Sequence, residues 1–110
     1  MANPDGTTLD RLYTVIASRR GGDPALSYSA KLLAGGAPAI AKKLGEETVE
    51  TIIEAVAGEP RQLAAESADL LYHLLVLWAA AGVTPAEVWQ ILEARAGTSG
   101  LAEKAARQRK

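Results

Sequence analysis

The sequence contains no cysteine, no phenylalanine and a single histidine, His73. Without cysteine the chain forms neither disulfides nor zinc–thiolate sites and has no thiol nucleophile, and a single histidine excludes a histidine-rich metal site. Aromatic residues make up only 5% of the chain and hydrophobic residues 48%, so the core must consist mostly of Leu, Val, Ile and Ala. Because Ala and Leu favour helices and no segment shows the alternation of a β-strand, the composition predicts an all-α protein.

Charge of one sign is not in excess, because 12 basic residues accompany 13 acidic ones and the net charge is −1. Such a balance gives no general attraction to nucleic acid or to an anionic membrane. The N-terminus lacks the basic and apolar regions of a signal peptide. The longest apolar run, 70–81, is broken only by His73 and is shorter than the ~20 residues that cross a bilayer. We therefore expect a cytoplasmic protein with neither nucleic acid nor a membrane as a partner.

The length of 110 residues predicts a single domain, 1–110. Glycine and proline divide it into a small bundle of about five helices. These are expected from Thr7 or Thr8 to about Arg19, from Ser27 to Gly35 and Gly36, from about Pro38 to Ala57, from about Pro60 to Ala81, and from Thr84 to near Gly97. Residues 98–100 are expected to form a loop, and 101–110 a frayed basic tail. A chain this short buries a modest share of its surface, and oligomerisation is a common remedy.

Acidic residues gather on one face of the helix expected over 38–57. This face carries Glu46, Glu47, Glu50 and Glu54, with Lys43 at its N-terminal end. The opposite face carries Val49, Ile52, Ile53 and Val56. On spacing alone, a solvated helix face with ion pairs such as Lys43 with Glu47 is the simpler interpretation of these acids.

The helix expected over 60–81 is apolar nearly all round and is therefore predicted to be buried. Glu66 and Asp69 lie at the start of its apolar run, so they must be protonated, bound to a metal, or paired with a base such as Arg61. If the two long helices pack antiparallel, this pair faces Glu47 and Glu50 of the preceding helix. Four clustered carboxylates repel one another unless a cation lies among them, and their oxygen atoms suit Mg²⁺ or Mn²⁺.

Two stretches, 42–51 and 66–73, closely resemble the phosphoribosyl-ATP pyrophosphohydrolases of histidine biosynthesis. More broadly, they match the EExxE…ExxD pattern of the all-α, MazG-like nucleotide pyrophosphohydrolases. The resemblance extends to 27–33, 95–100 and 103–105, and thus covers essentially the whole chain in order. It implies a MazG-like bundle completed as a homodimer. It also implies hydrolysis of phosphoribosyl-ATP to phosphoribosyl-AMP and pyrophosphate, the second step of L-histidine biosynthesis.

The resemblance implies roles for individual residues as well. The ligands of Mg²⁺, or of Mn²⁺ as a substitute, map onto Glu47, Glu50, Glu66 and Asp69. The catalytic residues that orient the attacking water are expected among Glu47, Glu50 and Glu46. The residues expected to contact the substrate phosphates are Lys42, Lys43 and Lys31, and for each of them a solvated surface charge is the alternative. Weaker candidates are His73, Arg95 and Lys104. We favour a packed, hydrogen-bonded role for His73, which follows Asp69 by one turn.

Two alternatives stay open. A housekeeping hydrolase of aberrant nucleoside triphosphates would use the same acidic site, although the matches at 27–33 and 95–104 favour phosphoribosyl-ATP. A helical interaction module, with an acidic face that serves solubility, would bind no Mg²⁺ and hydrolyse nothing. A ferritin-like di-iron bundle is excluded, because it needs a Glu-x-x-His motif on each of two helices and the residue three before His73 is Leu70.

Overall fold

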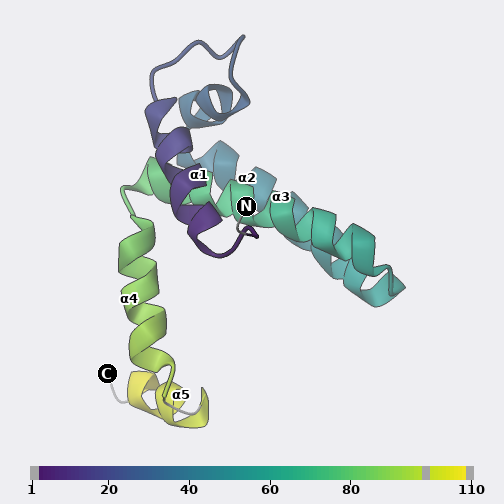
Figure 1. The fold of residues 1–110 in the computed structure, drawn as a ribbon, viewed down its shortest axis with the longest axis vertical. Helices are drawn as coiled ribbons and strands as arrows, with labels where there is room; N and C mark the ends of the chain where they lie inside the picture. The colour runs from purple at the N-terminus through teal and green to yellow at the C-terminus, as the bar shows by residue number, and fades with distance from the viewer. Residues whose placement is uncertain (1–2, 98–99, 109–110) are drawn as a thin grey trace.

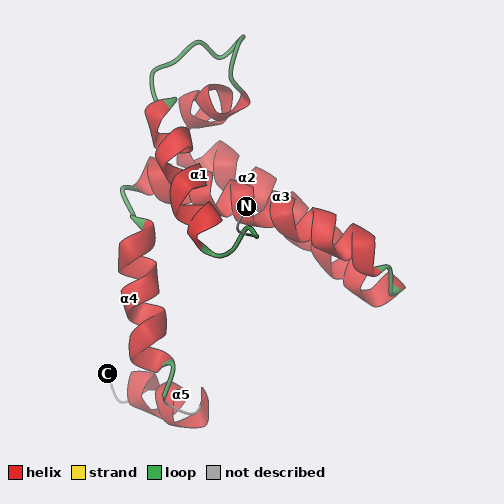
Figure 2. Ribbon diagram, viewed as in Figure 1, coloured by secondary structure: helices red, strands yellow, loops and turns green. Residues whose placement is uncertain are grey.

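The computed structural model describes residues 3–97 and 100–108, and every regular element within these ranges is a helix (Figure 1, Figure 2). The helices are α1 (Thr7–Ser18), α2 (Tyr28–Ala57), α3 (Pro60–Ala81), α4 (Pro85–Arg95) and α5 (Gly100–Gln108). The prediction of an all-α protein is therefore confirmed. The described part of the frayed tail expected over 101–110 is helical instead, because α5 covers Gly100–Gln108. Residues 98–99 of the expected loop and 109–110 of the expected tail lie outside the described residues.

The ends of α3 and α4 follow the sequence signals. Pro60 occupies the first turn of α3, where a helix has no use for its missing N–H, and Gly82 ends the helix with a φ of 78°. Thr84 caps α4: its hydroxyl accepts a hydrogen bond from the Glu87 N–H, and the Glu87 carboxylate accepts one from the Thr84 N–H. This reciprocal capping box fixes where α4 begins.

α2 differs from the sequence-based prediction of two helices around Gly35 and Gly36. The structure joins them in one element with a kink at Gly36, where φ is 82° and ψ is 168°. This combination is accessible to glycine because it has no Cβ. Pro38 follows within the next turn and lacks the N–H that would continue the hydrogen-bond ladder. The kink therefore turns residues 28–35 away from the axis of the rest of α2 (Figure 1).

The second part of α2 and α3 form an antiparallel hairpin, and α1 packs across α3 (Figure 1). Gly58, with a φ of 78°, ends α2 and lets the chain reverse before Pro60. The core lies where α1, α2 and α3 meet, and it consists of Ile16, Ile40, Leu75, Val76 and Ala79. The carboxylate-rich part of the hairpin thus extends beyond the core.

The chain is more open than a compact domain. Its radius of gyration is 16.2 Å, against about 13 Å for a compact domain of about 100 residues. α3 has the length and composition of a membrane-spanning helix, a property that it shares with core helices of soluble proteins. The prediction that α3 is buried all round is wrong for the isolated chain. His73, Leu75, Val76 and Ala79 are buried, but Leu71 is 42% exposed, because α1 and α2 cover only part of the helix.

The aliphatic face of α2 is exposed as well. We call it the aliphatic stripe; it consists of Val49, Ile52, Ile53 and Val56. These side chains are between 55% and 84% exposed, because α2 packs against α3 through a different face. A contiguous apolar surface of this kind commonly marks a contact with another protein chain.

Candidate metal centre

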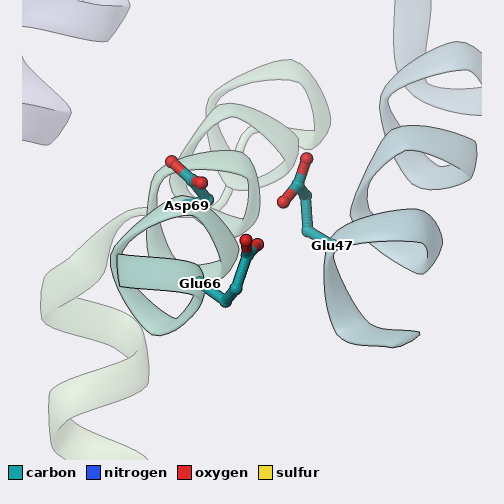
Figure 3. A group of neighbouring side chains, drawn as sticks. All are labelled: Glu47, Glu66 and Asp69. Atoms are coloured by element: carbon teal, nitrogen blue, oxygen red, sulfur yellow. The ribbon is translucent and has the colours of Figure 1, made fainter. Parts of the chain in front are cut away.

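The α2–α3 hairpin brings together carboxylates from both of its helices. One carboxylate oxygen from each of Glu47, Glu66 and Asp69 lies within 4.8 Å of the other two. Figure 3 shows Glu47 projecting from α2 toward Glu66 and Asp69 on α3. Residues three apart share a helix face, so the spacing of Glu66 and Asp69 presents both of them to the neighbouring helix. We call these three side chains the carboxylate cluster.

Thr51 helps to fix this arrangement across the hairpin. Its hydroxyl lies 2.8 Å from the carbonyl oxygen of Glu47, one turn earlier on α2, and 3.3 Å from that of Glu66 on α3. Thr51 does not stand out in the sequence, because a threonine within a helix ordinarily bonds to a carbonyl of its own helix. Only the packing of the hairpin reveals the second acceptor.

Two oxygens of the cluster are buried without a hydrogen-bond partner. Among the described residues, these are Oε2 of Glu47 and Oε2 of Glu66. An unpaired buried acceptor is costly, and a charged one more so. The expected alternative, an ion pair between Arg61 and Glu66 or Asp69, is not formed in the described part of the chain. The two orphaned oxygens and the hard oxygen donor set therefore fit a divalent cation such as Mg²⁺.

The electrostatics of Glu66 agree with this geometry. The pKa of its carboxyl is raised above the ordinary value, chiefly by desolvation and then by a hydrogen bond and repulsion involving Glu50. Repulsion from Asp69 and Glu47 raises this pKa further. The negative charge on Glu66 is thus poorly compensated by the protein itself, and a bound cation would reverse the direction of the shift.

Glu50 and Glu46 border the cluster. The Glu50 side chain is exposed and interacts with Glu66, but it is not one of the three carboxylates that meet most closely. Glu46 is also exposed, and its Oε2 lies 3.5 Å from Nζ of Lys43. The same Nζ lies 3.9 Å from Oε1 of Glu47. A solvated helix face therefore describes Glu46 but not Glu47, which is only 7% exposed.

The structure brings one of the candidate phosphate-binding residues, Lys43, to the cluster. Its pKa is raised, mainly by the negative charge of Glu46 and next by Tyr28. Lys42 is its exposed neighbour on α2. Lys31 is exposed on the part of α2 that precedes the kink.

The remaining basic candidates lie elsewhere in the fold. Arg95 ends α4, and Lys104 lies on α5. Both helices extend away from the α2–α3 hairpin (Figure 1). Within a single chain, these two residues are therefore not part of the surroundings of the carboxylate cluster.

His73 is packed and hydrogen-bonded directly behind the cluster. It is 4% exposed, and its Nδ1 lies 2.7 Å from the carbonyl oxygen of Asp69. Because a carbonyl oxygen only accepts, Nδ1 carries the proton. In the neutral ring, Nε2 then accepts from the Tyr28 hydroxyl, 3.3 Å away. Both ring nitrogens are therefore engaged. Tyr28 was not predicted as a functional residue from the sequence, although the match at 27–33 includes it.

Comparison with known proteins yields one consistent result. A family model described as phosphoribosyl-ATP pyrophosphohydrolase matches residues 9–96. A protein of Azospirillum brasilense named phosphoribosyl-ATP pyrophosphatase is 60% identical over 100 residues, which are 91% of this chain and 90% of that protein. The protein of the same name from Parvibaculum lavamentivorans is 60% identical over 103 residues, 94% of each chain. That of Rhodospirillum rubrum is 54% identical over 106 residues, 96% of this chain and 91% of the relative.

Proposed function

The chain belongs to the phosphoribosyl-ATP pyrophosphohydrolase family, and from this premise we propose that it hydrolyses phosphoribosyl-ATP in the presence of Mg²⁺. The products are phosphoribosyl-AMP and pyrophosphate, and the reaction is the second step of L-histidine biosynthesis. The observation that carries the proposal is the pair of orphaned, buried carboxylate oxygens within the carboxylate cluster. The bacterial relatives are enzymes of a biosynthetic pathway, so we place this one in the cytoplasm.

We assign the metal ligands to the carboxylate cluster, Glu47, Glu66 and Asp69, with Glu50 as the fourth. Glu50 already interacts with Glu66 and is exposed, so its side chain can turn toward the cluster without disturbing the core. Mg²⁺ bound there would neutralise charge on the polyphosphate and activate a water molecule, and Mn²⁺ is expected to substitute for it. Because none of the four is a histidine or cysteine, the donor set favours these hard cations over zinc.

Water attack requires a carboxylate that accepts its proton, and Glu46, Glu47 and Glu50 are the candidates. Glu46 is held at the rim by Lys43, whose Nζ lies 3.5 Å from its Oε2. Glu50 lies on the exposed side of the cluster, where water has access. The oxygen of water forms a bond to phosphorus, the α–β phosphoanhydride bond breaks, and the carboxylate takes up the proton from water.

Lysines at the edge of the cluster complete the site. Lys43 is poised between Glu46 and Glu47, so its ammonium group can exchange a carboxylate partner for a phosphate oxygen. Lys42 and Lys31 provide further exposed positive charge on α2. We propose that these three contact the substrate phosphates. We assign no role to Arg95 and Lys104 within their own subunit.

We propose further that the chain functions as a homodimer. The aliphatic stripe, with Leu71 on α3, leaves an exposed apolar surface along the hairpin, and the radius of gyration of 16.2 Å shows how open the single chain is. A second hairpin packed on the stripe would cover this surface and build a four-helix core. The surface then needs no other protein partner.

Pyrophosphate release tests the proposed reaction. Purified protein is incubated with phosphoribosyl-ATP, with ATP and with dCTP, each in Mg²⁺ and in EDTA. We expect release from phosphoribosyl-ATP that depends on Mg²⁺. Release only from ATP or dCTP would keep the metal site but indicate a housekeeping nucleotide hydrolase. No release from any of the three by folded protein would favour the non-enzymatic interaction module.

A further inference from the structure

Tyr28 is a half-exposed aromatic residue at the start of α2. Ser27 caps the helix here, since its hydroxyl accepts a hydrogen bond from the Ala30 N–H at 3.1 Å. The Tyr28 ring stacks on Tyr72 of α3, with 6.0 Å between ring centroids and 18° between ring planes. Although one face is covered in this way, Tyr28 remains 50% exposed. About half of the residue's surface is thus accessible to a ligand.

Hydrogen bonds hold this ring in place. The Tyr28 hydroxyl donates to Nε2 of His73, whose Nδ1–H in turn donates to the carbonyl oxygen of Asp69. The Tyr72 hydroxyl, under the stack, lies 2.5 Å from Oγ of Ser29. His73 also packs edge-on against both tyrosine rings. The exposed ring is therefore pre-organised, so a ligand that stacks on it does not have to order it.

The ring also lies beside the carboxylate cluster. On one side, a single residue, His73, separates the Tyr28 hydroxyl from the backbone of Asp69. On the other side, Tyr28 is, after Glu46, a cause of the raised pKa of Lys43, and Nζ of Lys43 is 3.9 Å from Oε1 of Glu47. An aromatic surface and a phosphate-binding site thus adjoin each other.

We propose that Tyr28 is a specificity-determining residue whose exposed ring face stacks on the purine ring of the nucleotide substrate. The inference deepens the proposed function and rests on it, because the substrate phosphates must be held at the carboxylate cluster. A nucleobase presents a flat π-face, and stacking on an aromatic side chain is a common way to bind one. The residues 27–35 before the Gly36 kink then supply base recognition, and the hairpin supplies the chemistry.

Binding of two product fragments tests the proposal. The affinities of AMP, which has the base, and of ribose 5-phosphate, which lacks it, are measured by calorimetry in Mg²⁺. Tyr28→Leu should weaken AMP about tenfold and leave ribose 5-phosphate unchanged. Tyr28→Phe, which keeps the ring, should bind AMP like the wild type. The matched control is Leu26→Ala, which alters a side chain that is 86% exposed nearby and should affect neither ligand.

Equal losses for AMP and ribose 5-phosphate, or no loss of AMP affinity, would overturn the proposal. So would a Tyr28→Leu variant whose only change is dissociation of the dimer, since the ring would then serve the subunit contact. If Tyr28→Leu fails to fold, photolabelling of the wild type with 8-azido-AMP tests instead whether the base binds at Tyr28. We expect the label in the tryptic peptide 21–31, which contains Tyr28, and a label found only elsewhere refutes stacking.

These outcomes are separable from failure of the proposed reaction. If the wild type releases pyrophosphate from phosphoribosyl-ATP and Tyr28→Leu has an unchanged KM, the proposed reaction stands and the role of Tyr28 is refuted. If the protein releases no pyrophosphate but 8-azido-AMP labels the peptide 21–31, the base site at Tyr28 stands and the proposed reaction is refuted.

Discussion

At Glu66, a single carboxyl lies beside three others, and its charge state links the stability of the hairpin to pH. Its pKa in the fold is raised above the ordinary value of 4.5. The folded chain therefore holds this proton more tightly than the unfolded chain does. As a result, Glu66 stabilises the metal-free fold below its ordinary pKa, and this contribution is lost as the pH rises through the raised pKa.

We expect Glu66→Gln to melt at a higher temperature than the wild type in EDTA at neutral pH, and the difference to vanish toward pH 4. In Mg²⁺ this difference in melting temperature should narrow or reverse. Bound Mg²⁺ stabilises the wild type, and the amide of the Glu66→Gln variant is a poorer ligand than the carboxylate. Thermal unfolding followed by circular dichroism checks both statements. Glu59→Gln, at an exposed position before α3, is the control and should match the wild type. A lower melting temperature for Glu66→Gln in EDTA would refute the account.

Turnover should depend on Glu50 far more than stability does. Glu50→Gln removes a carboxylate at the open side of the cluster, so kcat should fall by about a hundredfold or more. The side chain is exposed, so unfolding by urea should be nearly unchanged. Glu54→Gln, one turn further along α2, is the matched control and should turn over like the wild type. Wild-type activity of Glu50→Gln would remove this residue from the proposed site.

At the scale of the elements, the local signals of the sequence predict helix ends well. Pro60 and Gly82 bound α3, and the Thr84–Glu87 capping box begins α4, as predicted. Each of these signals acts within one turn of the chain, so it can be recognised without knowledge of the fold. The acidic face of α2 was predictable for the same reason, because helical periodicity alone places residues on faces.

Contacts between helices were not predictable in this way. Periodicity does not tell which face of one helix meets which face of another, so the bridge from Thr51 to the carbonyl oxygen of Glu66 was missed. The stacking of Tyr28 on Tyr72 was missed too, because 44 positions separate them along the chain. Burial of α3 was overestimated, since it depends on how much of the helix its neighbours cover.

The kink in α2 gives a prediction for two adjacent glycines. Gly36→Ala forces a side chain into a backbone conformation that essentially only glycine adopts, so it should lower the free energy of unfolding by about 1–3 kcal/mol. Gly35→Ala, whose new Cβ would lie 3.4 Å from that of Ala39, should be neutral or slightly stabilising. Urea unfolding of both variants measures the difference. Equal stabilities would show that the kink does not require the left-handed φ at Gly36.

At the scale of the whole molecule, the exposed aliphatic stripe makes the dimer testable. Ile53→Glu places a charge on a side chain that is 56% exposed in the single chain, so it should cost the chain itself little. Buried in a dimer, the same charge lacks a partner, and the protein should become monomeric and less stable. Light scattering coupled to gel filtration gives the mass. Leu26→Glu, at an exposed position off the stripe, should stay dimeric, and a dimeric Ile53→Glu would exclude the stripe as the contact.

The proposed ligands Glu47 and Glu50 and the aliphatic stripe lie on different faces of the same turns of α2, residues 46–56. If the stripe holds two chains together, assembly and the catalytic geometry share one support. The fraction of chains that are folded and dimeric then depends on protein concentration. The active fraction therefore falls once the cellular concentration of the chain approaches the dissociation constant of the dimer. Gene expression would affect the rate of the proposed reaction in two ways, through the number of chains made and through the fraction of those chains that are dimeric and active. Flux through the step would therefore respond more than proportionally to a drop in transcription.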